Sequence, residues 1–204
     1  MKKTLIYSLP MSVKDIISYE NGLFKTEISS EPFYYAIHAY LAKHMQPEDD
    51  YKIIFIAKRD GFGREVEAER ICKEELERIN AKIGAKLEYK IIATDFDMQK
   101  TVYDTLFSSL IDEIEDGSTI LWDITFGPKD VPLVVFATLN FAEKFLDCEI
   151  EHIFYSQGTY KDGKLIHAKL VTMDSLFSLI SLVNNVDCDS PEKARNLVKL
   201  LTSL

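Results

Sequence analysis

Residues 119–132 read TILWDITFGPKDVP, and this stretch shows how the chain alternates between strand and helix. Its first five residues form a short apolar run, which is typical of a buried strand. A polar loop follows, and Pro132 then suits the first turn of a helix because that turn has no use for its missing N–H. The stretch therefore predicts a strand over 119–123, a loop over 123–130 and a helix over 131–145.

The same alternation continues on both sides of this stretch. Short apolar runs predict further strands over 4–9, 52–57, 87–93 and 150–155, and amphipathic segments predict further helices over 31–45, 65–83 and 99–115. Five strands separated by four helices are typical of an α/β fold of the Rossmann-like kind. In such a fold a parallel sheet carries helices on both faces.

The pattern changes after the fifth strand. A turn signal at 160–164 predicts a hairpin between the strand over 150–155 and a further strand over 165–172. Two apolar helices are expected beyond it, over 175–183 and 191–201. They either complete the core, or form a dimer contact or the link to a removed domain.

Composition and cysteine usage bound the class of protein. The chain has 204 residues, of which 47% are apolar and 28% charged, and this balance excludes disorder and favours a soluble globular protein. No stretch approaches the ~18 apolar residues that cross a bilayer, so no membrane contact is expected. Three cysteines without CxxC spacing predict a reduced, cytoplasmic location and argue against a zinc site.

The charge balance excludes one class of partner. There are 24 basic and 33 acidic residues, a net charge of −9. A protein that binds a long phosphate backbone carries a basic stripe, so duplex nucleic acid is not an expected partner. Any anionic ligand should be small and held by local features.

The loops after the strands are the places to look for a site. Ligands of open parallel sheets bind beyond the carboxyl ends of the strands, where the strand order reverses. If the order of the five strands is 3-2-1-4-5, the loop after the first strand (loop one) faces the loop after the fourth (loop four). In loop four, Thr125 offers a hydroxyl, Gly127 lets backbone approach a ligand, and Lys129 offers a cation at a helix N-terminus.

Simpler roles are open for the same residues. Asp123 can cap backbone while Lys129 points to water, and Ser8 and Ser12 of loop one can cap the segment that follows Pro10.

Two tyrosines offer a further way to bind a nucleotide. Tyr7 and Tyr155, near strand ends, could stack on a base.

The loop after the second strand (loop two) has the densest positive charge. Lys58, Arg59 and Arg64 surround two glycines, Gly61 and Gly63. The full GxGxxG fingerprint is absent, which argues against an ordinary nicotinamide or flavin oxidoreductase. Either this loop helps to bind an anion, or Arg64 only pairs with carboxylates of the next helix. The four histidines are scattered, so no metal is expected, and no cofactor either.

Loop four also carries a family resemblance. Residues 122–132 (WDITFGPKDVP) resemble the CRISPR-associated Rossmann fold (CARF) family, in which this region commonly reads Asp-x-Thr-His-Gly-x-Arg/Asn before a proline and an apolar helix. Residues 149–155 (EIEHIFY) are similar to the strand that follows in the family. The stretch from residues 25–27 through 36–41 is similar to its first helix region. The resemblance covers residues 1–185.

The resemblance implies a ligand and an assembly. CARF domains pair as homodimers and bind a cyclic oligoadenylate, the second messenger of type III CRISPR antiviral defence, in a groove across the two-fold axis. It thus implies a sensor for cyclic tetra- or hexa-adenylate over 1–185. Residues 186–204 would be a helical extension or a linker to an effector domain absent from this chain. The expected ligand-binding residues are Ser8, Leu9, Pro10, Met11, Ser12, Lys58, Arg59, Thr125, Phe126, Gly127, Pro128 and Lys129.

Catalysis is left open. The family histidine is Phe126 here, and Pro128 and Lys129 stand where the family has Arg or Asn. Some members of the family also cleave their ligand, by attack of a ribose 2′-hydroxyl on the adjacent phosphate without a metal. A metal-independent ring nuclease is therefore the alternative, with Lys129 and Ser12 as its catalytic candidates.

Overall fold

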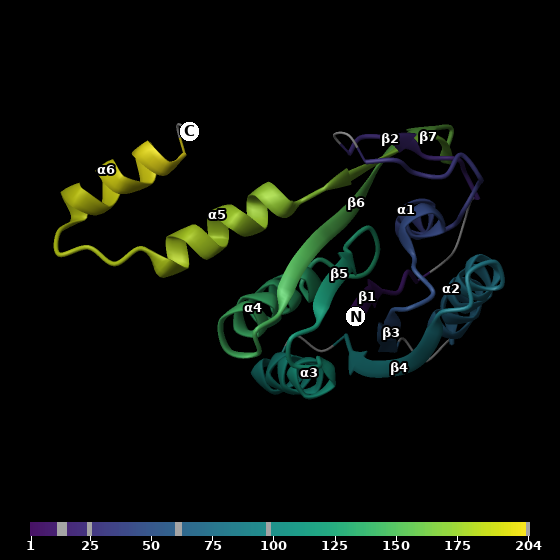
Figure 1. The fold of residues 1–204 in the computed structure, drawn as a ribbon, viewed down its shortest axis with the longest axis horizontal. Coiled ribbons are helices and arrows are strands. Elements are labelled where there is room, and N and C mark those ends of the chain that lie inside the picture. Colours follow the sequence, from purple (N-terminus) through teal and green to yellow (C-terminus); the bar gives the residue numbers. More distant parts are fainter. Residues whose placement is uncertain (12–15, 24–25, 60–62, 97–98, 203–204) are drawn as a thin grey trace. The chain divides into compact units, whose positions relative to one another are not determined.

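The computed structural model describes residues 1–11, 16–23, 26–59, 63–96 and 99–202. The chain divides into two compact units, Met1–Thr172 and Met173–Leu204 (Figure 1). The predicted boundary between residues 185 and 186 separates a sensing domain from an extension, and it stays a prediction.

A single sheet organises the first unit. Its order is β2-β7-β6-β5-β1-β3-β4, and β4, β3, β1, β5 and β6 run parallel to their neighbours in that series. The prediction of the order 3-2-1-4-5 for the five main strands is confirmed. The strands are β1 (Lys2–Ser8), β2 (Glu20–Asn21), β3 (Asp50–Arg59), β4 (Lys86–Asp95), β5 (Thr119–Asp123), β6 (Glu149–Lys161) and β7 (Lys164–Thr172).

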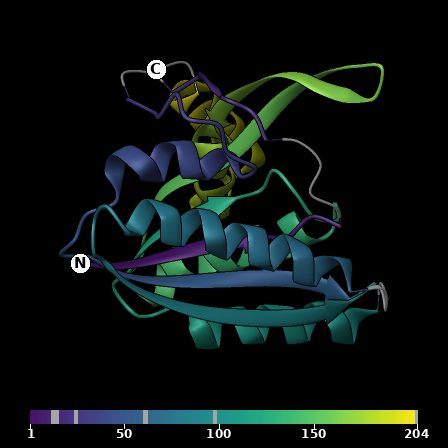
Figure 2. The same ribbon diagram turned by 90° about the vertical axis from the view of Figure 1, so that its right-hand side faces the viewer.

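Helices cover both faces of this sheet, as the α/β prediction requires. On one face lie α1 (Ala36–His44) and α2 (Arg64–Asn80), and on the other lie α3 (Lys100–Glu113) and α4 (Val131–Phe145) (Figures 1 and 2). The central strand β1 shows why both faces of the sheet need a covering of helices. Leu5, Ile6 and Tyr7 of β1 are fully buried, because successive side chains point to opposite, equally covered faces.

The predicted hairpin is confirmed as the antiparallel pair β6–β7. Its turn residues Asp162 and Gly163 have φ values of 51° and 76°, the left-handed pair that a tight two-residue hairpin turn needs. Figure 2 shows the ribbon projecting beyond the rest of the sheet. The two-residue strand β2, parallel to β7, has no sequence signal of its own.

The prediction that the first helix begins at Glu31 is wrong, since α1 begins at Ala36. Phe33 instead exchanges backbone hydrogen bonds with Ile17, at 3.2 and 2.9 Å. This bridge holds the chain extended, so the helix can start only after it.

A carboxylate from another helix caps α1. The Glu75 side chain of α2, 6% exposed, accepts hydrogen bonds from the N–H groups of Tyr34 (2.9 Å) and Tyr35 (3.3 Å). It also lies 2.7 Å from Nδ1 of the buried His38, whose Nε2 lies 3.2 Å from the Tyr7 hydroxyl. Glu75 therefore joins α2 to the start of α1, where Tyr35 provides no side-chain cap.

The second unit consists of α5 (Asp174–Asn185) and α6 (Pro191–Leu201). The Ser190 hydroxyl caps α6 by accepting from the N–H of Lys193 at 3.3 Å. Large apolar side chains stay exposed on both helices, namely Leu176, Leu179, Val183, Leu197, Leu200 and Leu201. In the described part of the chain, no helix has the length and apolarity to cross a membrane.

Substituting Glu75 tests the capping role. We expect Glu75→Gln to lower the free energy of unfolding by about 1–3 kcal/mol, because an amide replaces a buried carboxylate that accepts from three donors. Glu75→Ala should cost more, since it leaves the N–H groups of Tyr34 and Tyr35, directly before α1, without an acceptor. Urea unfolding followed by circular dichroism measures both. The exposed neighbour Glu74→Gln is the control, and an equal loss there would contradict the assignment.

Candidate functional site

Loop one and loop four meet where the strand order reverses. β1 lies between β5 and β3, so the loops after β1 and β5 leave the same edge of the sheet side by side. Gly127 of loop four has φ +92°, and a Cβ placed on it would lie 2.9 Å from the Cβ of Ser8. Only glycine allows this approach, so the two loops are in direct contact, as the topology predicts.

Asp123 sets the conformation of loop four. Its carboxylate is 2% exposed, and Oδ1 accepts a hydrogen bond from the N–H of Thr125 at 2.8 Å. Burial raises the pKa of Asp123, although the Thr125 hydroxyl and N–H, His38 and the N–H of Ile37 all favour the ionised form. The capping role for Asp123 is therefore present in the structure. Its other oxygen, Oδ2, has no hydrogen-bond partner among the described residues.

Thr125 fastens loop four to the neighbouring strand. Its Oγ1 accepts a hydrogen bond from the N–H of Ser156 at 2.9 Å. The N–H of Ile124 donates to the carbonyl of Phe154, also at 2.9 Å. The hydroxyl that the sequence offers to a ligand is thus engaged by β6, and Thr125 holds the loop in place.

The next residues of loop four separate into inward and outward positions. Phe126 packs against Tyr35 with the ring centroids 5.6 Å apart, edge to face. Pro128 is half-buried, whereas Lys129 is exposed. Within the described ranges no acidic side chain pairs with Lys129, so its ammonium is available at the start of α4.

Loop one is mostly buried at this point. Ser8 is 2% exposed, and its Oγ has no hydrogen-bond partner in the described part of the chain. Leu9 continues the β1 ladder by donating its N–H to the carbonyl of Ile56 at 3.0 Å. The side chain of Pro10 is buried and that of Met11 half-buried. Ser12, the other predicted hydroxyl, lies outside the described residues.

Loop two contributes a buried ion pair. Lys58 is 3% exposed, and its Nζ lies 2.5 Å from Oδ2 of Asp130 and 5.3 Å from the centre of the Phe96 ring. Arg59, the other predicted ligand residue here, is exposed. Gly61 lies outside the described residues, and Arg64 begins α2.

The pKa of Asp130 reports this pair. Burial favours the neutral carboxyl, but the Lys58 ammonium and the Tyr103 hydroxyl outweigh it, and the pKa lies below its ordinary value. The residue therefore stays a carboxylate at neutral pH. Sequence reasoning missed Asp130. The available signal was its place in the sequence, directly before the helix that follows loop four.

The base-stacking interpretation is wrong for Tyr7. That side chain is fully buried under α1, and burial raises the pKa of its hydroxyl. Tyr155 is 37% exposed and lies directly before Ser156, the residue that binds Thr125. Base stacking by Tyr155 stays a prediction.

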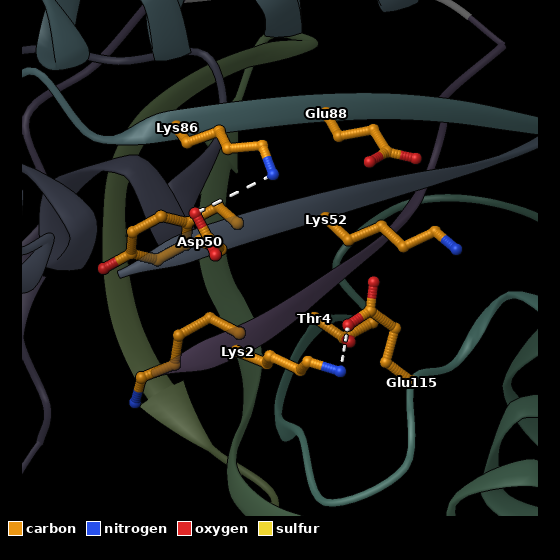
Figure 3. A pocket seen from close by; sticks show the side chains of 9 residues that line it. Lys2, Thr4, Asp50, Lys52, Lys86, Glu88 and Glu115 are labelled. Carbon is orange, nitrogen blue, oxygen red and sulfur yellow. Dashed lines mark ion pairs between the residues drawn. The ribbon is translucent and has the colours of Figure 1, made fainter. Parts of the chain in front are cut away.

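A hollow, which is a second candidate for an anion site, lies at the opposite edge of the sheet. It encloses about 270 Å³ at the start of β1, β3 and β4, with lysines and acidic residues around it (Figure 3). Each of its lysines pairs with a carboxylate: Lys2 with Glu115, Lys3 with Glu151, Lys52 with Glu113, and Lys86 with Asp50. This hollow offers no uncompensated charge to an anion.

No metal centre emerges from the described residues. They contain no group of three or more His, Cys, Asp or Glu side chains placed to hold an ion. The arrangement at loops one and four is suited instead to holding an anion by an ammonium, a hydroxyl and backbone N–H groups at the start of α4.

Gly127→Ala tests the contact between the loops. Alanine at positive φ costs about 1–2 kcal/mol, and the approach to Ser8 adds a steric cost. The control is Gly163→Ala, which has a similar φ of +76° but nothing within 4 Å of the added Cβ. We expect Gly127→Ala to lose clearly more stability than Gly163→Ala in urea unfolding. Equal losses would mean that the loops are not in contact.

The chain was compared with known proteins. No protein-family model matches it. It is 26% identical over 155 residues to the CRISPR-associated protein MJ1674 of Methanocaldococcus jannaschii, a match that covers 70% of this chain and 24% of that protein. The chain therefore spans about a quarter of the length of this relative.

Proposed function

We propose that this chain is a sensor domain that binds a cyclic oligoadenylate, with four or six adenylate units, in type III CRISPR antiviral defence. In this proposal it works in the cytoplasm as a homodimer and controls an effector domain or partner outside this chain. The similarity to a CRISPR-associated protein supports the role in CRISPR defence. The nature of the ligand rests on the site.

One observation carries the ligand assignment. Loops one and four touch at the reversal of strand order, with Ser8 against Gly127, and Lys129 stands exposed beside them. Open parallel sheets bind nucleotides at this position. The ammonium of Lys129 and the first N–H groups of α4 would hold one phosphate, and the Ser8 hydroxyl would hold a second polar group of the ligand.

The homodimer follows from the shape of such a ligand. A cyclic oligoadenylate repeats the same unit around a ring, and a two-fold interface presents every loop twice. One ring can therefore meet two copies of loop four, each contributing one Lys129. The backbone of Leu9, Pro10 and Met11 would line the groove between them.

A ring nuclease is the second candidate, favoured by the exposed ammonium of Lys129 beside a helix N-terminus. A ribose 2′-oxygen would bond to the adjacent phosphorus while the bond to the 5′-oxygen breaks. The proton lost by the 2′-hydroxyl is balanced by one gained at the 5′-oxygen, giving a cyclic 2′,3′-phosphate end. Lys129 would stabilise the charge on the phosphoryl oxygens.

Calorimetric titration with cyclic tri-, tetra-, penta- and hexa-adenylate tests the proposal, with Lys129→Ala as the key variant. Removing two charge-assisted contacts, each worth about 1.5–3 kcal/mol, should weaken binding by roughly a hundredfold or more. The exposed Lys161→Ala, at the end of β6 beside the hairpin turn, is the matched control and should bind like the wild type.

Two outcomes would contradict parts of the proposal. If no ring binds the wild type, the sensor function is wrong. If Lys129→Ala binds as tightly as the wild type, loop four is not the phosphate site. Chromatography of the ligand after incubation decides between the two candidates, because only a ring nuclease converts it to linear products.

The homodimer has its own measurement. Light scattering at tens of micromolar protein should give about twice the chain mass of 23.4 kDa. The exposed apolar residues of α5 and α6 are the proposed contact, so Leu197→Asp should shift the mass toward the monomer. Asn196→Asp adds the same charge at a polar position of α6 and is the control. A monomer mass for the wild type would contradict the dimer.

A further inference from the structure

We infer that the Lys58–Asp130 ion pair is a latch, which a phosphate group of the ligand opens by replacing the Asp130 carboxylate as the partner of Lys58. This inference rests on the proposed function and concerns the regulation of the same site. It accounts for a buried lysine of loop two that pairs with a partly buried acid at the end of loop four.

The latch joins three elements. Lys58 lies near the carboxyl end of β3 and Asp130 directly before α4, and the two side chains are only 3% and 15% exposed. The Tyr103 hydroxyl of α3 also acts on the Asp130 carboxylate. The Phe96 ring lies 5.3 Å from the Lys58 ammonium. Opening the pair would therefore free groups on β3, α3 and α4 together.

Asp130 does not serve the usual purpose of an acid at this position. A side chain before a helix normally caps it, but the Asp130 side chain makes no capping hydrogen bond to α4. Its carboxylate faces Lys58 instead. The acid therefore contributes no capping hydrogen bond to the helix, whereas it holds the lysine in an ion pair.

The carboxylate occupies the place of an anionic ligand. A phosphate at the start of α4 would be attracted by the helix N-terminus and by nearby cations, and in the free protein one of those cations already has an anionic partner. A phosphate offers more acceptor oxygens than a carboxylate and suits the same ammonium.

A second observation points to a ligand at this place. The Ser8 hydroxyl is 2% exposed and has no hydrogen-bond partner within the described residues, although it lies against Gly127 of loop four. Buried polar groups are rarely left unpaired. A ligand seated between the loops would satisfy Ser8 and, with the latch open, Lys58.

The cost of opening sets the apparent affinity. Binding that must first break the pair is weaker than binding to an open site, by the fraction of molecules in which the site is open. Removing the carboxylate should therefore tighten binding, provided that Lys58 remains. Simple removal of a negative charge would instead tighten binding with or without Lys58.

A double-mutant cycle separates these two effects. Asp130→Asn, Lys58→Met and the double variant are titrated with cyclic tetra- and hexa-adenylate by calorimetry. We expect Asp130→Asn to bind about tenfold more tightly than the wild type. In the Lys58→Met background the same substitution should bring no gain. Asp116→Asn, an exposed acid at the opposite edge of the sheet, is the charge control and should bind like the wild type.

Folding is checked for every variant, because a single substitution leaves one member of a buried pair alone. Thermal unfolding followed by circular dichroism identifies a temperature at which all variants are folded, and the titrations are run there. The double variant removes both charges at once, so neither is left buried alone. If the wild type binds a ring and the folded Asp130→Asn does not bind it more tightly, the latch is wrong and the sensor function stands. A gain of equal size in both backgrounds also overturns it. If neither the wild type nor Asp130→Asn binds any ring, the proposed function fails and the latch with it.

Discussion

The placement of β1 between β3 and β5 is the constraint on which the rest of the structure depends. Both of its edges are used, so β1 pairs in parallel with β3 over Lys2–Ser8 and with β5 up to Asp123. The chain must therefore leave β1 and β5 at the same edge and turn in opposite directions. Loops one and four are brought into contact by hydrogen bonding in the sheet, and the short side chain of Ser8 and the absence of a side chain at Gly127 make that contact possible.

Buried carboxylates then fix the elements around this junction. Glu75 caps α1 from α2, and Asp123 holds loop four while the N–H of Ile37, in α1, stabilises its charge. Glu75 thus binds the start of α1 to the neighbouring helix, and His38, which lies beside Glu75, also favours the ionised form of Asp123. Groups held in this way lose little freedom when a ligand binds, which favours affinity.

Local patterns predicted the elements and their order, whereas contacts between distant residues were beyond them. Apolar runs placed β1, β3, β4, β5 and β6, and the signal is clearest in β1, β3 and β5, because strands buried on both faces are apolar throughout. The start of α1 was missed because it depends on Ile17 and Glu75, neither of which is close in the chain. The residue types of loop four were recognised, but the partners of Thr125 and Lys58 lie 31 and 72 residues away, and no local pattern encodes such pairings.

The overall charge of the protein and its candidate ligand have the same sign, and the distribution of charge resolves the conflict. A net charge of −9 repels an anion at long range, but charges in physiological salt act over only about 8 Å. Short-range contacts therefore decide where an anion can stay. At the far edge of the sheet Lys2, Lys52 and Lys86 are each neutralised by an acid. At loop four the charge of Lys129 is not offset in this way by a described acid, and the start of α4 adds partial positive charge. On the proposed function, an anion that enters the acidic field of this protein would therefore bind at loop four rather than at its larger cluster of lysines.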